Sequence, residues 1–167
     1  MTAALELFSE EGYRNTSTVK IAKRAHVSEA LIFRHFKNKE GLLEAIVMEG
    51  ETHEKELFSN IIVETDPKEV LRKTIRIGQT IDADQDAASY WKLNYKLKWE
   101  LELYSEHKMQ EVQNKLMEAF TALRYKNPQQ EATLLLTSID GMATRYFLQK
   151  SFDIDAFTNF LMIKYGL

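Results

Sequence analysis

Apolar residues recur every three or four positions along nearly the whole chain, which is the period of an amphipathic α-helix. We find no convincing run that alternates apolar and polar residues, as a half-buried strand would. Six glycines and two prolines among 167 residues interrupt the helical pattern and divide it into about eight or nine segments. This pattern predicts an all-α fold.

The expected helices begin at residues that favour helix N-termini. Asp66-Pro67 and Asn127-Pro128 each combine a capping residue with a proline at the first helical position, where a missing amide hydrogen is tolerated. Gly12 suits the left-handed conformation that ends many helices. The expected caps are Thr16 or Thr18, Ser28, Asn38, Asp66, Ser105, Asn127 and Asp153.

Residues 21–36 read IAKRA-HVS-EALIFRHF, which matches two helices joined by a turn of about three residues, a helix-turn-helix. The major groove of DNA accommodates one helix, and a reading helix enters it with its N-terminal residues. Here those residues are Glu29, Ala30 and Leu31, with Arg34 one turn later. The segment therefore predicts a helix that reads DNA, in which Arg34 reaches a guanine or a phosphate.

The charge of the chain is distributed unevenly. Its formal net charge is −3, yet residues 14–39 carry seven lysines and arginines against a single acid, Glu29. That segment therefore has a charge of +6 and the rest of the chain −9. Such an asymmetry is typical of a surface that binds a polyanion, although a basic run can also be a solvated face without a ligand.

The pattern T-x-T-x-x-I-A-x-x-A-x-V-S-x-x-x-I-F-x-H-F-x-x-K-E-x-L, from Thr16 to Leu42, closely resembles the DNA-binding domain of the TetR family of bacterial transcriptional regulators. AALELFSEEGY, ahead of it, is similar to the first helix of that family, and SIDGMATRYF to a motif in its penultimate helix. The resemblance implies a three-helix DNA-binding domain over residues 1–45, joined to a helical ligand-sensing and dimerisation domain over residues 46–167.

The resemblance also assigns roles to single positions. It implies phosphate contacts at Thr18, His35 and Lys39, and the last of these lies beside a helix N-terminus, which favours anions. Base-facing positions are implied for the residues at the start of the reading helix. The whole expected DNA-binding set is Thr18, Ser28, Glu29, Ala30, Leu31, Phe33, Arg34, His35 and Lys39.

The chain departs from the family pattern at two of its positions. The family usually has tyrosine where this chain has Phe33, so a hydroxyl-to-phosphate bond is lost and packing alone remains. It usually has glycine in the turn, where this chain has His26. Histidine tolerates positive φ better than most residues, yet its Cβ atom makes a slightly altered turn an expectation here.

The stretch SYWKLNYKLKW gathers four aromatic residues in a few helical turns. Trp91, Tyr95 and Trp99 are spaced by four and lie on one stripe. Core packing is one interpretation of such a stripe, and a pocket between helices for an apolar or aromatic small molecule is the other. The resemblance favours the pocket, for which we expect Tyr90, Trp91, Tyr95, Trp99 and Phe120.

The last two expected helices have broad apolar faces. A monomer could bury these faces internally, but the resemblance implies that they pair with a second copy as a four-helix dimer interface. A dimer also suits a DNA site made of two half-sites. The expected interface residues are Leu135, Ile139, Ala143, Phe147, Phe157 and Leu161.

Several kinds of chemistry lack their residues. The chain has no cysteine, phosphate-binding glycine loop, nucleophile elbow or HExxH pair, so we expect no catalytic site, no metal and no cofactor. No apolar run approaches the roughly 20 residues of a membrane helix. We expect a soluble, cytoplasmic protein without a membrane partner.

Together these features predict a homodimeric regulator that binds a palindromic double-stranded DNA operator and responds to a small-molecule effector. Repression rather than activation is implied by the resemblance alone. The main alternative is a helical protein-interaction module whose basic N-terminal patch meets an acidic partner. An enzyme that processes its ligand is a third alternative, which no residue in the sequence requires.

Overall fold

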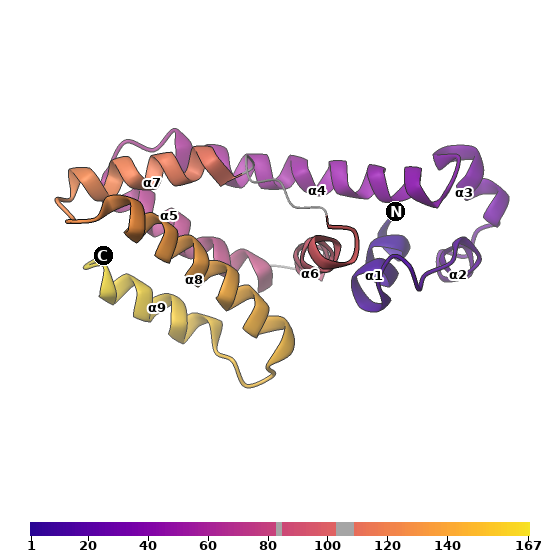
Figure 1. Cartoon of the computed structure of the whole chain (residues 1–167). Coiled ribbons are helices and arrows are strands. Elements are labelled where there is room, and N and C mark those ends of the chain that lie inside the picture. Colours follow the sequence, from indigo (N-terminus) through magenta and orange to yellow (C-terminus); the bar gives the residue numbers. More distant parts are fainter. Residues whose placement is uncertain (83–84, 103–108) are drawn as a thin grey trace. The chain divides into compact units, whose positions relative to one another are not determined.

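The computed structural model describes residues 1–82, 85–102 and 109–167. All regular secondary structure in these residues is helical, which confirms the predicted all-α fold (Figure 1). The elements are α1 (Thr2–Glu11), α2 (Thr18–Arg24), α3 (Glu29–Phe36), α4 (Lys39–Ile62), α5 (Pro67–Arg76), the 3₁₀ helix η1 (Ile77–Asp82), α6 (Gln85–Glu100), α7 (Gln110–Ala122), α8 (Pro128–Leu148) and α9 (Ile154–Lys164).

Side-chain caps set several of the predicted helix starts. The Ser28 side chain accepts a hydrogen bond from the backbone N–H of Leu31 at the start of α3. Asp66 accepts from two backbone amides of the first turn of α5, and Asp153 accepts from one at the start of α9. Asn38 accepts from the amide of Gly41, at 2.7 Å, at the start of α4. These bonds confirm the predicted boundaries. The boundaries were predictable because each bond joins residues only two or three positions apart.

The predicted cap of α2 was wrong, Asn127 occupies the predicted cap position of α8 without a side-chain bond, and one predicted cap is not described. Ser17 caps α2 by accepting from the backbone N–H of Lys20. The Thr16 hydroxyl is instead buried and donates to the carbonyl oxygen of Gly12, at 2.8 Å, so it does not face α2. Asn127 precedes α8 without a side-chain cap bond, and Ser105 lies outside the described residues.

Contacts divide the chain into two compact units, which we describe separately. The N-terminal unit comprises Met1–Glu54 with Asp84–Tyr104, and the C-terminal unit comprises Lys55–Ala83 with Ser105–Leu167. This division follows packing, whereas the expected division at residues 45 and 46 concerns function and stays a prediction.

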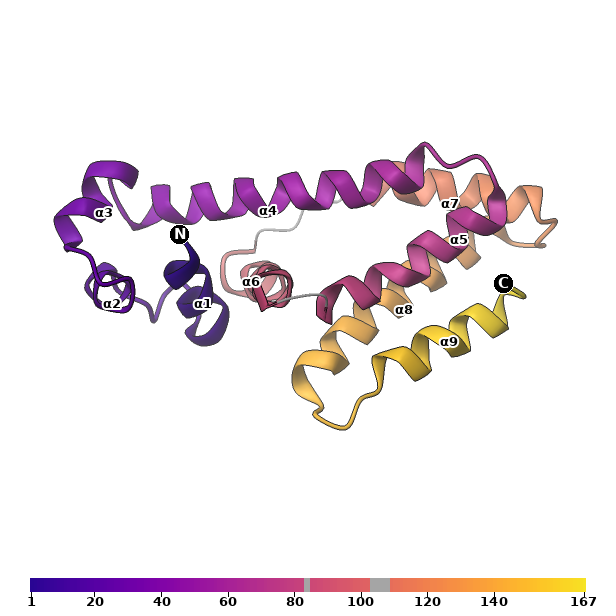
Figure 2. The same cartoon turned by 180° about the vertical axis from the view of Figure 1, so that it is seen from behind.

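The N-terminal unit packs α1, α2, α3 and the first half of α4 around a shared core. Phe8 of α1 and Ile46 of α4 are fully buried there. Helix α6 lies beside α1 (Figure 2) and contributes Leu93 and Leu97 to the same core. A segment far along the sequence therefore supports the three N-terminal helices.

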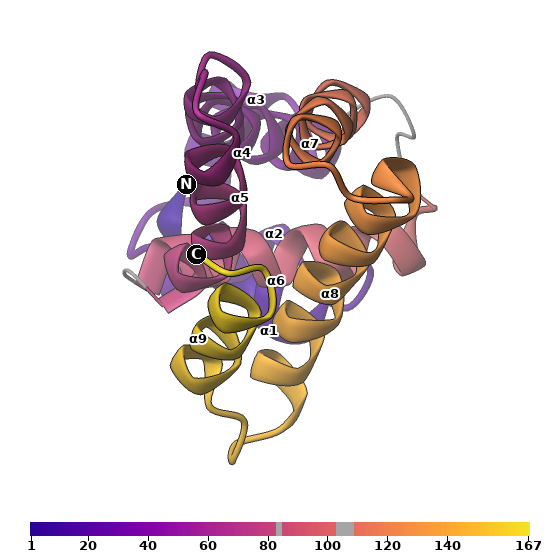
Figure 3. The ribbon, with the colours of Figure 1, turned by 90° about the vertical axis from the view of Figure 1, so that its left-hand side faces the viewer.

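The C-terminal unit packs α5, α7, α8 and α9 together with η1 (Figure 3). Helix α7 contacts both α5 and α8, and α9 contacts α5 and α8. Leu71, Leu116 and Leu135 are among its fully buried side chains. None of the helices in the described residues has the length and hydropathy that a membrane span requires.

Candidate nucleic-acid interface

Helices α2 and α3 form the predicted helix-turn-helix. The backbone N–H of Val27 donates to the carbonyl oxygen of Ala22 at 3.0 Å and closes the turn between them. His26 adopts a φ of +54°, which is the left-handed conformation that the position requires. The turn therefore holds histidine in a left-handed conformation, at some conformational cost.

One face of α3 packs inward and the other is open. Ile32 is buried, and Phe36 packs against the core of the N-terminal unit. Thr18, Glu29, Leu31 and Lys39 are half-buried, and the exposed members of the expected DNA-binding set are Ser28, Ala30, Phe33, Arg34 and His35. Helix α3 thus presents most of its expected DNA-binding residues on its outer side.

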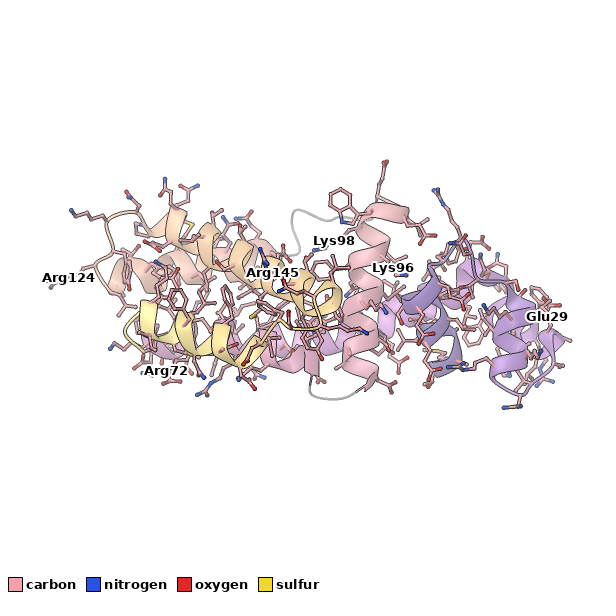
Figure 4. The ribbon with its side chains drawn as sticks, turned by 90° about the horizontal axis from the view of Figure 1, so that it is seen from below. Glu29, Arg72, Lys96, Lys98, Arg124 and Arg145 are labelled. Atoms are coloured by element: carbon pink, nitrogen blue, oxygen red, sulfur yellow. The ribbon has the colours of Figure 1, made fainter. Side chains whose placement is uncertain are left out.

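Glu29 is the first residue of α3 and lies at the start of this outer face (Figure 4). The Thr18 hydroxyl donates to the Glu29 carboxylate, with 2.5 Å between Oγ1 and Oε1. This bond joins the first residue of α2 to the first residue of α3. It also occupies the hydrogen that a phosphate contact by Thr18 would use.

The Lys39 ammonium group bonds to the loop between α1 and α2. It donates to the carbonyl oxygens of Tyr13, at 2.8 Å, and Thr16, at 2.9 Å, and lies 4.1 Å from the centre of the Tyr13 ring. Two of its three hydrogens are therefore engaged with the loop between α1 and α2, and the cation also contacts the aromatic face. Lys39 fixes this loop to the start of α4.

Tyr13 and Glu40 extend the same network. The Tyr13 hydroxyl donates to the Glu40 carboxylate at 2.9 Å. Burial, together with the bond to Glu40, raises the pKa of Tyr13 to about 12. Bonds from its own backbone amide and from Tyr13 lower the pKa of Glu40. Tyr13 is therefore a neutral donor and Glu40 a charged acceptor near pH 7.

Two charged side chains of α6, Glu100 and Lys96, bond to backbone groups at the end of α1 and in the loop after it. The two oxygens of Glu100 accept from the backbone amides of Tyr13, at 3.0 Å, and Arg14, at 2.5 Å. Lys96 (Figure 4) donates to the carbonyl oxygen of Glu10 at 2.7 Å. Gly12 has a φ of +91°, and a Cβ atom there would lie 3.0 Å from Glu100. This contact could not be predicted from the sequence, because no spacing signal links residues 86 positions apart.

The expected effector-pocket residues are divided between the two units, with Phe120 in the C-terminal unit and the other four in the N-terminal unit. Tyr90 packs on Gly50, where a Cβ atom would lie 2.9 Å from its ring. Trp91 and Tyr95 are half-buried, with stacked rings 6.4 Å apart. Trp99 is 87 % exposed. Phe120 is fully buried in the C-terminal unit, where its ring contacts Tyr125 and Tyr165, so that side chain serves core packing.

The residues of the expected dimer-interface set differ in their burial within the chain. Leu135, Ile139, Ala143 and Leu161 are buried within their own chain, while Phe147 and Phe157 are half-buried. The first four fill the core between α8, α9 and their neighbours within their own chain, and the role of the set in a dimer stays a prediction. The apolar residues that α8 and α9 expose are instead Leu134, Leu148, Phe160 and Ile163.

Metal chemistry finds no support in the part of the chain that the structure describes. Within it, no three His, Cys, Asp or Glu residues group closely enough to hold a metal ion.

Comparison with known proteins places these features in context. Residues 1–46 match the model of bacterial regulatory proteins of the tetR family. The HTH-type transcriptional regulator YvkB of Bacillus subtilis is 55 % identical over 47 residues, which are 28 % of this chain and 25 % of the relative. The chain thus matches about a quarter of that relative's length.

Solved structures share the fold over nearly the whole chain. A transcriptional regulator of the TerR/AcrR family from Aquifex aeolicus has a TM-score of 0.72 at 18 % identity, covering 99 % of this chain and 94 % of that one. AibR, in complex with isovaleryl coenzyme A and operator DNA, has a TM-score of 0.71 at 21 % identity, covering 97 % and 96 %. At these identities the similarity establishes the fold.

Proposed function

Because the chain belongs to the TetR family of bacterial regulatory proteins, we propose that it binds a palindromic operator as a homodimer and leaves it when an effector binds. The family consists of DNA-binding transcriptional regulators and not of enzymes. We propose repression as the sign of regulation, because a bound dimer would block access to the DNA it covers.

The observation that carries DNA binding is the outer face of α3. A serine-capped helix of eight residues turns Ile32 into the core and leaves Ala30, Arg34 and His35 exposed. The surrounding residues 14–39 carry a charge of +6. An exposed helix start within a basic surface is the arrangement that enters a major groove.

A test compares two DNA duplexes and two salt concentrations. Fluorescence anisotropy should show that the chain binds DNA from upstream of its own gene more tightly than a scrambled duplex, with the preference retained as salt rises. Binding to an acidic protein partner would also weaken with salt but would show no base preference. Equal affinity for both duplexes, followed by no enriched sequence from a random DNA pool, would refute operator recognition.

For the effector we propose an apolar or aromatic small molecule that contacts α6. This helix carries Trp91 and Tyr95 on one stripe, and its last turn holds the end of α1 through Lys96 and Glu100. A ligand that moves α6 would therefore act on the helices that support α3. AibR, of the same fold, was crystallised with an acyl-coenzyme A and operator DNA, which agrees with a ligand-responsive regulator.

The proposed mechanism is a shift between two populated conformations. A ligand that prefers one spacing of the two reading helices lowers operator affinity in proportion to that preference. Helix α4 is the proposed connector, because it runs without interruption from Lys39 to Ile62 and contributes residues to both units. A ligand that binds the protein tightly without releasing operator DNA would contradict this mechanism.

For the dimer we propose that a second copy covers the exposed face of α8 and α9. Leu134, Gly141 and Leu148 recur every seven residues along α8 and therefore share one side of it. They are all exposed, and no atom lies within 4 Å of a Cβ atom built on Gly141. Phe160 and Ile163 add exposed apolar area on α9. Exposed apolar residues on two helices that contact each other favour an interface.

A further inference from the structure

Residues 14–39, which include α2 and α3, contain one acid among seven cations, and that acid is Glu29. As the first residue of α3 it occupies the part of the helix that would approach base edges. A carboxylate at this place repels the phosphates of any DNA duplex. The carboxylate therefore lowers affinity for DNA in general. A hydrogen bond to a particular base would offset this repulsion at some sequences only.

The Glu29 carboxylate is held in place by its neighbour. Thr18 donates its hydroxyl hydrogen to Oε1 at 2.5 Å, and both side chains are half-buried. Glu29 is not needed as the cap of α3, because Ser28 performs that role toward the backbone N–H of Leu31. A carboxylate with one oxygen fixed by a hydroxyl presents its second oxygen in a defined direction.

A carboxylate accepts hydrogen bonds and donates none, which restricts the bases it can read. Guanine presents two acceptors in the major groove, and thymine presents an acceptor and a methyl group. Adenine places its N6 donor beside the N7 acceptor, whereas cytosine presents the N4 donor without an acceptor on the same edge. Cytosine is therefore the base that suits a carboxylate.

We propose that Glu29 selects cytosine at one position of each half-site and that Thr18 is the positioning residue for its carboxylate. This inference rests on the proposed DNA-binding function and deepens it. It also gives Thr18 a role different from the phosphate contact that the family resemblance implies, because the hydrogen needed for that contact is directed to Glu29.

The experiment selects duplexes from a random DNA pool with the full chain and compares the enriched sequences among variants. Glu29→Gln keeps the size of the side chain and removes its charge. Glu44→Gln makes the same charge change at an exposed position of α4 and serves as the matched control. Thr18→Val removes the hydroxyl and keeps the shape. Circular dichroism and thermal melting establish that each variant is folded.

The wild-type chain and Glu44→Gln should enrich the same half-site. Glu29→Gln should lose the preference at one cytosine of it, with discrimination against the other bases falling by about fivefold to 150-fold, the range of one good base contact. Its affinity for scrambled DNA should rise because a phosphate-repelling charge is gone. Thr18→Val should weaken the preference at the same position and leave the other positions unchanged.

Several results would overturn the inference while operator recognition stands. One is an unchanged half-site in Glu29→Gln, and another is a change at a position where the wild type does not prefer cytosine. A uniform loss of affinity for all sequences in Thr18→Val would show that Thr18 contacts phosphate instead. If the wild-type chain enriches no sequence at all, the proposed function itself fails.

Discussion

Arg34 is the exposed side chain of α3 whose loss should alter both affinity and specificity. We expect Arg34→Ala to weaken operator binding by about 1–3 kcal/mol and to relax preference at one base pair, if Arg34 reads a guanine. Lys39→Ala should instead weaken binding to all DNA sequences alike. It should also lower the melting temperature, because two carbonyl oxygens lose their donor. Anisotropy titrations with selected and scrambled duplexes distinguish the two variants. An equal loss of affinity for both duplexes in Arg34→Ala would rule out base reading by Arg34.

His26 holds a positive φ of +54° in the turn of the helix-turn-helix. The left-handed conformation costs an L-residue about 1–2 kcal/mol. Glycine avoids this cost, but it loses more backbone entropy on folding, so only part of the gain remains. We therefore expect His26→Gly to stabilise the chain by about 0.5–1 kcal/mol in urea unfolding. His26→Ala keeps the Cβ atom and should give no such gain; equal stabilisation by both variants would contradict the backbone explanation.

Helix α5 begins after a loop that depends on one carboxylate, Glu64. Its oxygens accept from Lys73, at 2.6 Å, and from the backbone amides of Thr65 and Asp66, and these bonds lower its pKa from 4.5 to about 2. Because the folded pKa lies below the unfolded one, this stabilisation is complete above pH 4.5 and is lost as pH falls toward 2. The melting temperature of Glu64→Gln should therefore fall less steeply than that of the wild type over this range.

Other carboxylates titrate in the same pH window, so the comparison needs a matched variant. Glu44→Gln removes an exposed carboxylate from α4 and should leave the slope of melting temperature against pH close to that of the wild type. If Glu64→Gln and Glu44→Gln give the same slope, the bonds to Lys73 and the two amides do not contribute as expected.

Helix α6 should hold the α1–α2 loop through Glu100. Removing its carboxylate leaves the backbone amides of Tyr13 and Arg14 without an acceptor. We expect Glu100→Ala to lower the free energy of unfolding by about 1.5–3 kcal/mol, the range for hydrogen bonds to charged groups. Amide hydrogen exchange at Tyr13 and Arg14, followed by NMR, should become faster. Glu102→Ala, an exposed carboxylate two residues on, is the control; unchanged exchange in Glu100→Ala would show that α6 does not hold this loop.

At the scale of the whole molecule, the proposed dimer depends on α8 and α9. Phe160 and Ile163 are 59 % and 77 % exposed. Replacing both with glutamate should weaken association by at least about 2 kcal/mol, or roughly 30-fold, because central apolar contacts dominate such interfaces. Sedimentation velocity measures the change, with Met48→Glu on α4 as an exposed apolar control. A wild-type chain that sediments as a monomer at micromolar concentration would contradict the proposal.

Most helix boundaries and the helix-turn-helix could be predicted because their causes are local. Ser28 and Asp66 each bond to an amide two or three positions away, and Ile32 is buried as the helical period indicates. The resemblance to the TetR family depends on residues within one continuous segment, 16–42, so the sequence alone was sufficient to identify it.

Only the tertiary structure decided which apolar and polar groups meet. The helical period marks a face of α8 as apolar without telling whether a neighbour or a second copy covers it, so Leu135 and Leu134 could not be told apart. Thr16 or Thr18 was expected to cap α2, but Thr16 is buried against the end of α1 and Ser17 is the cap. The bonds from Glu100 to Tyr13 and Arg14 cross 86 or more positions. Such contacts depend on how the helices pack. Packing involves pairs of residues far apart in the sequence, so local spacing cannot predict it.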